Sequence, residues 1–331
     1  MNENVYSCFL SAVHRSAFCL HHWFSLLTAD YCSRYGGSMP LNSSTIGATA
    51  DPIVHDVDAR WLMAYAAGLG DTLPCYLDTL RPQSIIGHPL FPVCVEWPTV
   101  LAMRAQAETM GLTMDEAIRS VHATHDVILH RSARPGDRLT TRATIVGVEQ
   151  REPGAFQVMR LDTVDAHGKL VSTTWQGGLF RDVAVTGPNR PATEIPPLPS
   201  AAATGATARH EVKIPISALA AHVYTECAHI WNPVHTDTAV ADRAGLPGLI
   251  LHGTATLALA VSQVVKLEAS CEPSQVRRIA GRFNAMVMMP SEITVRILSR
   301  EKTADGDAVC FEVRNAEGAP AVRDGVVLLK G

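Results

Sequence analysis

Apolar and polar residues alternate with a period of two over most of the chain beyond residue 124. Turn signals, RPGD at 134–137 and DAHGK at 165–169, interrupt this alternation. Such a pattern is typical of antiparallel strands that bury one face. It predicts two groups of strands: 125–133, 137–151, 155–170 and 170–182 in the first, then 210–218, 275–287, 292–303, 307–318 and 320–331 in the second.

The spacing of apolar residues predicts helices over 57–71, 96–108 and 253–269. The run from Thr254 to Leu267 is almost free of charge, and a helix that is apolar on every side is normally buried. An antiparallel sheet wrapped around that helix would bury it. The expected fold class is therefore α+β, with two units that share an order of elements.

Residues 183–210 separate the two units. This segment holds five prolines between 188 and 199, followed by a run rich in Ala, Thr and Gly. Such a composition predicts a semi-rigid, extended spacer rather than a packed element. We therefore expect an N-terminal extension at 1–44, a first unit at 45–182, a linker at 183–210 and a second unit at 211–331.

The N-terminal extension contains one apolar stretch, SAFCLHHWFSLLTA at 16–29. It lacks a positive n-region and a clear cleavage site, so it does not fit a secretory signal peptide. It is also too short and too polar to span a bilayer. We interpret residues 1–38 as an upstream extension, from an over-called start, and expect 1–44 to be disordered; the alternative is a short helix packed on the first unit.

Composition and charge exclude several classes of protein. Of the 331 residues, 47% are hydrophobic and 18% are charged, so disorder over most of the chain is excluded. The formal net charge of −4 argues against nucleic-acid binding through an overall basic surface. The eight cysteines have no CxxC spacing, which is typical of reduced thiols in a cytoplasmic protein. Because glycine-rich phosphate motifs and metal-ligand spacings are missing, no nucleotide redox cofactor and no metal are expected.

The most specific local signal is WNPVH at 231–235, followed by AGLPG and ILHG up to residue 253. This segment resembles the hydratase motif of the MaoC-like family of (R)-specific enoyl-CoA hydratases and acyl dehydratases. A weaker resemblance covers YAAGLGD at 65–71 and HRSARPGD at 130–137, which are similar to the non-catalytic first repeat of double-hotdog members. The resemblance implies a tandem hotdog fold, in which each repeat is a long helix wrapped by an antiparallel sheet and the first repeat helps to form the acyl pocket.

The resemblance also implies a reaction, the addition of water to an enoyl thioester or its reverse, in fatty acid metabolism. A base activates water for attack at C3, a proton reaches C2, and donors stabilise the charge on the thioester oxygen. In the family motif D-x-N-P-x-H, Asn232 and His235 match as candidate catalytic residues. The Asp position is occupied by Ile230, which can neither bind nor deprotonate water.

Two nearby residues are candidates to replace the missing carboxylate. Glu226 lies one helical turn before Ile230, and His229 is its direct neighbour. Alternatively, Glu226 is a solvated surface charge and His229 a polar replacement for the family's glycine. Gly253 opens the long apolar helix and offers a backbone N–H as an oxyanion donor, although close packing would explain a glycine there equally well. His252 is expected to be a structural residue on the same turn.

The substrate is expected to be carried as a CoA thioester, without a separate cofactor. Because CoA carries phosphates, basic residues should surround its site, and Arg278 and Arg282 are the candidates. Alternating charge along a strand would explain both residues equally well. We expect no nucleic-acid or membrane partner, and we expect a homodimer by analogy with other hotdog proteins. Trp61 and residues 91–97 are candidates to line an acyl tunnel.

Three functions are compatible with this sequence. The first is an acyl-CoA hydratase or dehydratase that uses His235 with a replacement partner. The second is a hotdog thioesterase, in which Glu226 or another carboxylate activates water against the thioester carbonyl. The third is a catalytically silent acyl-CoA-binding protein, for which Ile230 would be the mark. Enoyl turnover, thiol release and binding without turnover distinguish these three.

Overall fold

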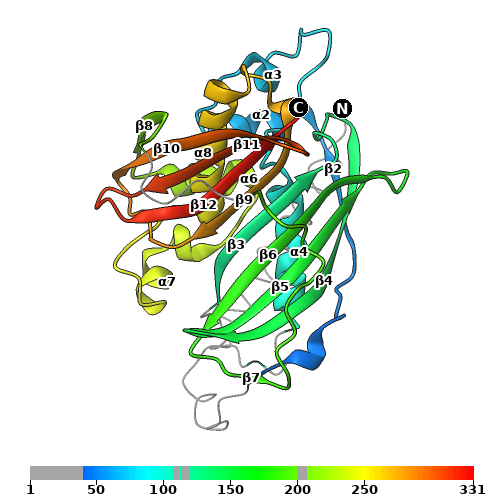
Figure 1. Ribbon diagram of the computed structural model, residues 1–331, viewed down its shortest axis with the longest axis vertical. Helices are drawn as coiled ribbons and strands as arrows, with labels where there is room; N and C mark the ends of the chain where they lie inside the picture. The colour runs from blue at the N-terminus through cyan, green and yellow to red at the C-terminus, as the bar shows by residue number, and fades with distance from the viewer. Residues whose placement is uncertain (1–39, 107–111, 113–119, 200–206) are drawn as a thin grey trace, which may run out of the picture. The chain divides into compact units, whose positions relative to one another are not determined.

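Ten strands form one antiparallel sheet in the computed structural model, in the order β2-β4-β5-β6-β3-β9-β12-β11-β10-β8 (Figure 1). The structure describes residues 40–106, 112, 120–199 and 207–331, and Pro40–Gly331 form one unit. The first half of the sheet consists of β2 (Ile53–Val57), β3 (Ser120–Leu129), β4 (Asp137–Arg151), β5 (Gly154–Val164) and β6 (Leu170–Arg181). The second half consists of β8 (His210–Ile216), β9 (Val276–Phe283), β10 (Ser291–Thr303), β11 (Gly306–Arg314) and β12 (Pro320–Leu329).

The two halves repeat one order of elements and meet at β3 and β9. In the described part of the chain, each half runs one strand, three α-helices and then four strands, with β2 and β8 as the two edges of the sheet. At the junction Thr124 lies opposite Arg282, and Ile128 lies opposite Arg278. The predicted α+β tandem hotdog arrangement is thereby confirmed, with the two strand groups joined into a single sheet. The division into domains at 183–210 stays a prediction.

The long helix predicted at 253–269 is α8 (Gly253–Glu268), which packs on β9, β10, β11 and β12. Its buried side chains point in all directions around the axis, since the four successive residues Ala255, Thr256, Leu257 and Ala258, which span a full turn, are all buried. The sheet of the second half therefore covers a helix that is apolar on every side, as the low charge of this run predicted.

The corresponding helix of the first half is α4 (Pro92–Arg104), which packs on β4 and β5. It begins four residues before the predicted start at 96, because Pro92 occupies the first turn, where a missing N–H costs nothing. Pro98 then lies within the helix and cannot donate to the preceding turn. The predicted end at 108 lies outside the described residues.

Shorter helices surround these two. They are α2 (Ala59–Gly68), α3 (Pro74–Leu77), α6 (Ala220–Ala228) and α7 (Thr238–Arg243), with 3-10 turns η1 (Ser43–Thr45), η3 (Pro233–His235) and η4 (Pro273–Gln275). The α2 and α6 helices pack together. A Cβ at Gly68 would lie 2.8 Å from the Cβ of Cys227, so the glycine permits this close approach.

The proline-rich segment lies on the sheet rather than forming a free spacer. The backbone of Arg190 exchanges two hydrogen bonds with Val148, at 2.8 and 2.9 Å. Ala192 and Ile195 pack on an outer apolar cluster of the first half around Trp175. Proline lacks the N–H of a sheet ladder but keeps its carbonyl oxygen as an acceptor, so this segment can still be fixed. The expectation of an unpacked spacer is therefore wrong for the described part, 183–199.

The expectation of a disordered extension over 1–44 is also wrong at its end. Strand β1 (Leu41–Asn42) pairs in parallel with β7 (Val185–Thr186). Leu41 is fully buried in the first-half core, because pairing with β7 brings its side chain over that core. Residues 1–39, including the apolar stretch at 16–29, lie outside the described residues.

Candidate active site

The NPVH segment forms the connection between α6 and α7. His229 ends α6 in a left-handed conformation, with φ of 56°, and its N–H donates to the carbonyl of Thr225. The chain then runs extended through Asn232 and enters the turn η3 at Pro233. The carbonyl of Asn232 accepts from the N–H of His235 at 3.1 Å. Asn232 therefore orders this loop through its backbone, as an Asn-Pro turn commonly does.

His235 is held by a hydrogen bond from its Nδ1 to the carbonyl of Ile250, at 3.0 Å. Because a carbonyl oxygen only accepts hydrogen bonds, Nδ1 carries the proton and Nε2 keeps the lone pair. Burial lowers the pKa of His235 to about 4, so the ring is neutral at pH 7. This arrangement leaves Nε2 as a hydrogen-bond acceptor and a base.

His252 packs face to face against this ring. The two imidazole centroids are 3.7 Å apart, with 28° between the planes. His252 is 3% exposed, and its Nε2 lies 3.3 Å from the hydroxyl of Thr225. Burial, with a further contribution from His235, lowers the pKa of His252 well below its ordinary value. The sequence predicts only a structural turn residue at position 252. In the structure, His252 also supports the ring of His235.

Gly253 is the first residue of α8, as predicted. The first N–H groups of a helix have no acceptor within the helix and lie at its positive end. Next to them, the hydroxyl of Tyr224 donates to Thr254 Oγ1 at 3.1 Å and lies 3.4 Å from the hydroxyl of Tyr65. The sequence does not assign these hydroxyls to the site, although Tyr224 lies only seven residues before the WNPVH segment.

Close packing also favours glycine at the start of α8. A Cβ at Gly253 would lie 3.1–3.3 Å from ring atoms of Phe283. The ring of Phe283 in turn contacts His122 of β3, with centroids 4.8 Å apart. The packing explanation for Gly253 is therefore supported by the geometry, and it is compatible with a donor role for the backbone N–H.

The two candidate replacements for the missing Asp do not gather around His235. Glu226 is exposed on α6. The ring of His229 is stacked between Trp61, at 4.5 Å, and Trp231, at 5.3 Å. The left-handed turn at His229 sends its side chain into this stack instead of towards His235. No hydrogen bond between either candidate and His235 occurs in the described part of the chain, so a dyad with His235 is not formed here.

Ile230 itself is buried in the main apolar core, with 5% of its surface exposed. Its backbone N–H donates to the carbonyl of Thr225 at 3.1 Å. The family's Asp position thus holds a side chain that packs with the core, which agrees with its apolar chemistry.

The two arginines proposed for CoA phosphates lie in different environments. Arg278 is 6% exposed and forms a bidentate pair with Asp126, at 2.8 and 2.7 Å. Its guanidinium also donates to the carbonyls of Pro196 and Pro197. This set of acceptors makes Arg278 a structural residue that joins both halves to the proline-rich segment. Arg282 is half-exposed, 3.7 Å from Asp324, and a phosphate contact stays a prediction for it alone.

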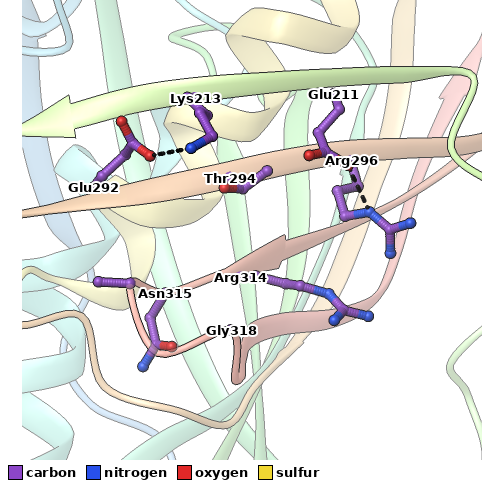
Figure 2. A pocket seen from close by; sticks show the side chains of 9 residues that line it. Glu211, Lys213, Glu292, Thr294, Arg296, Arg314, Asn315 and Gly318 are labelled. Carbon is purple, nitrogen blue, oxygen red and sulfur yellow. Dashed lines mark hydrogen bonds and ion pairs between the residues drawn. The ribbon is translucent and has the colours of Figure 1, made fainter.

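A groove of about 480 Å³ lies elsewhere, on the second half of the sheet (Figure 2). Its charged side chains neutralise one another, because Lys213 pairs with Glu292 at 3.0 Å and Arg296 with Glu211 at 3.2 Å. Arg314 is paired as well, with Glu312 at 2.8 Å. None of the candidate site residues lines this groove, and it offers no unpaired charge for a phosphate.

Within the described residues, no group of three or more His, Cys, Asp or Glu side chains is placed to hold a metal ion. Among the helices of the described ranges, none is both long and apolar enough to cross a membrane.

Comparisons with known families match both halves of the chain. Residues 199–319 match the MaoC-like domain, and residues 44–174 match the FAS1-like dehydratase domain region. The chain is 33% identical over 101 residues to peroxisomal enoyl-CoA hydratase 2 of Arabidopsis thaliana, which is 30% of this chain and 31% of that protein. It is 35% identical over 75 residues to the fatty acid synthase beta subunit of Aspergillus oryzae, 23% of this chain and 4% of that one. The aligned region thus spans under a third of these relatives.

Solved structures share the fold. A MaoC-like dehydratase from Phytophthora capsici superposes with a TM-score of 0.70 at 19% identity, covering 87% of this chain and 96% of that one. The peroxisomal multifunctional enzyme type 2 of Drosophila melanogaster gives a TM-score of 0.69 at 20% identity, covering 85% of this chain and 48% of the other. At these identities the likeness concerns the fold alone.

Proposed function

Because residues 199–319 match the MaoC-like domain and residues 44–174 match the FAS1-like dehydratase domain region, we propose that this chain is an acyl-CoA hydratase or dehydratase with His235 as its base. The observation that carries this proposal is the orientation of one ring. The carbonyl of Ile250 fixes the proton of His235 on Nδ1 at 3.0 Å, which leaves the Nε2 lone pair for water.

The reaction then requires a single base. Nε2 of His235 takes a proton from water while the water oxygen bonds to C3 of the enoyl group. The π electrons move to C2, and the thioester oxygen becomes negative. The resulting imidazolium returns the proton to C2, so that water adds across one face of the double bond. This cycle uses neither Glu226 nor His229, which agrees with the absence of a hydrogen bond from either of them to His235 in the described chain.

The start of α8 supplies the compensating charge. The N–H of Gly253 lies at the positive end of a 16-residue helix, where a developing anion on the thioester oxygen is stabilised. The Tyr224 hydroxyl, bonded to Thr254 at 3.1 Å, fixes the side chain next to this donor. A side chain at residue 253 would meet Phe283. Glycine therefore allows the backbone N–H donor to lie close to the ring of Phe283.

A second function, acyl-CoA binding without turnover, is supported by two observations. Ile230 replaces the family's Asp and is buried in the core. Burial also lowers the pKa of His235 to about 4, well below the neutral range in which a general base is most effective. The thioesterase alternative has less support, because Glu226, the one carboxylate named for it, is exposed on α6.

Incubation with crotonyl-CoA separates these functions. A hydratase removes the enoyl absorbance without releasing thiol, and His235→Gln lowers its kcat by at least about a hundredfold. A thioesterase releases CoA thiol. Binding of crotonyl-CoA in calorimetry, with no loss of enoyl absorbance and no release of CoA thiol, would identify a binding protein. This result would contradict the proposed reaction.

We further propose that the substrate is an acyl-CoA thioester that reacts without a separate cofactor. By analogy with other hotdog proteins, we propose that the protein is a homodimer. The cysteines of the described part, Cys75, Cys94, Cys227, Cys271 and Cys310, are all free thiols. Free thiols are typical of a reducing compartment, which supports activity in the cytoplasm.

A further inference from the structure

Four polar side chains are buried between α4 and the inner face of the first half of the sheet. They are Glu96 and Thr99 of α4, His125 of β3 and Gln157 of β5, with exposed fractions of 2%, 0%, 2% and 6%. We call these four residues the inner polar cluster. Thr99 follows Glu96 by one turn, so both project from the same side of α4.

Three members of the inner polar cluster have no hydrogen-bond partner for a buried atom. Within the described chain, Thr99 Oγ1, His125 Nδ1 and Gln157 Nε2 are all unpaired. The fourth, Glu96, accepts from the hydroxyl of Thr174 at 2.6 Å. Buried polar groups are nearly always paired in native proteins, and each unpaired one destabilises the fold. Several unpaired groups in one cluster therefore point to a ligand that pairs with them.

The sheet register places room for such a ligand beside the cluster. Gln157 lies opposite Gly178 on β6, and Gly178 lies opposite His122 on β3. A Cβ at Gly178 would meet only Ser120 Oγ, at 3.6 Å. On the inner face, the position between Gln157 and His122 therefore carries no side chain.

A series of ring contacts joins the inner polar cluster to the candidate active site. The ring of His125 lies 5.4 Å from that of His122, and His122 lies 4.8 Å from Phe283. Phe283 packs against Gly253 at the start of α8. The acyl chain of a thioester bound at the α8 N-terminus could extend along these rings. It would then reach the inner polar cluster from the second half of the protein.

The cluster is neutral and rich in donors. Burial raises the pKa of Glu96 to about 8, so its carboxyl group keeps its proton at pH 7. Burial lowers the pKa of His125 to about 4, so its ring is uncharged. Gln157 and Thr99 add an amide N–H and a hydroxyl. Such a set favours an uncharged oxygen acceptor over an anion or a cation.

We propose that the inner polar cluster binds an oxygen atom, as a hydroxyl or oxo group, that the substrate carries on its acyl chain away from the thioester. This inference rests on the proposed function, because it takes the thioester to lie at the start of α8. It makes the preferred substrate an oxygenated acyl-CoA rather than a plain fatty acyl-CoA.

A series of trans-2-enoyl-CoA substrates of one chain length tests this proposal. Each carries a hydroxyl or oxo group at a different carbon, and the unsubstituted chain and an ω-carboxyl chain serve as references. The kcat/KM of at least one oxygenated chain should exceed that of the plain chain by about tenfold or more. Binding of the same thioesters is measured by calorimetry, so that a preference is detectable even without turnover.

Variants of the cluster then separate binding from structure. Thr99→Val and Gln157→Leu should abolish the preference while leaving turnover of the plain chain unchanged. Since Thr99 Oγ1 and Gln157 Nε2, which these variants remove, have no partner in the described chain, neither variant should lower the melting temperature by more than a few degrees. Thr294→Val, on the second half, removes a hydroxyl outside the cluster and should keep the preference.

The outcomes are distinct. Equal kcat/KM for every oxygenated and plain chain would overturn this inference and leave the proposed hydratase function standing. Preferential binding of an oxygenated chain without turnover would support the subsite and contradict the hydratase. A preference for the ω-carboxyl chain, or loss of stability in Thr99→Val without loss of the preference, would also overturn the subsite.

Discussion

The imidazole of His252 lies face to face with that of His235, with ring centroids 3.7 Å apart. Both rings are kept neutral mainly by burial, which lowers the pKa of His235 to about 4 and lowers the pKa of His252 well below its ordinary value. Because His252 directly precedes the first residue of α8, this contact couples the candidate base to the candidate oxyanion donor. The stack therefore fixes the ring plane of His235 relative to the helix start.

We expect His252 to position His235 without taking part in proton transfer. His252→Phe keeps a flat ring in the stack and should lower kcat by less than about tenfold, because only the contact is needed. His252→Ala removes the ring and should lower kcat by about a further tenfold, since a small displacement of a base is costly. Steady-state hydration of crotonyl-CoA by both variants checks this. If His252→Phe is as inactive as His235→Gln, His252 itself exchanges protons.

Restoring the family residue at position 230 should harm the protein. Ile230 is 5% exposed in the core, so Ile230→Asp buries a carboxyl group without a designed partner. We expect the free energy of unfolding to fall by about 2–5 kcal/mol, measured by denaturant titration. Ile230→Val, the matched control, should cost about 1 kcal/mol. A stable Ile230→Asp protein with raised hydratase activity would show that this side chain reaches the substrate.

The ion pair between Asp126 and Arg278 should be important for stability. It is buried, bidentate, and joins β3 of the first half to β9 of the second. Asp126→Asn leaves the Arg278 charge buried without its partner and should lower the free energy of unfolding by about 3–5 kcal/mol. The control, Asp324→Asn, removes an exposed pair at 3.7 Å and should cost less than about 0.5 kcal/mol. Equal effects of the two variants would contradict this assignment.

The strands and the long helix could be predicted because local pattern determines them. β4 has the same limits as its predicted run, 137–151, and α8 differs from its prediction by one residue. Each of these segments carries its own signal, the period of two or the absence of charge, independently of the rest of the chain.

The arrangement of the site could be predicted only in part. His235 and Gly253 were identified from the motif, but the stacking of His229 between two tryptophans depends on a left-handed turn that the sequence does not specify. Arg278 was assigned to phosphate because its partner, Asp126, is 152 residues away in sequence. Contacts of this kind arise from sheet register, which becomes known only with the fold.

The buried carboxyl of Glu96 gives a stability prediction whose sign can be worked out. Burial raises its pKa in the folded protein to about 8, above its ordinary value near 4.5. The folded state thus binds more protons than the unfolded state between about pH 4.5 and 8. In this window the contribution of Glu96 to the free energy of unfolding therefore falls as the pH rises. Below pH 4.5 both states are protonated, and the contribution of Glu96 to stability is fully present.

Glu96→Gln removes this titration and keeps an acceptor for the Thr174 hydroxyl, which now donates to Glu96 at 2.6 Å. At each pH we take the free energy of unfolding of the variant minus that of the unchanged protein. This difference should increase by at least about 1 kcal/mol from pH 5 to pH 8. Histidines titrate in the same range, but they are common to both proteins and cancel in the difference. Denaturant unfolding at the two pH values measures it. Glu226→Gln, an exposed control on α6, should show no such gain, and a flat difference for Glu96→Gln would mean that Glu96 is ionised in the folded protein.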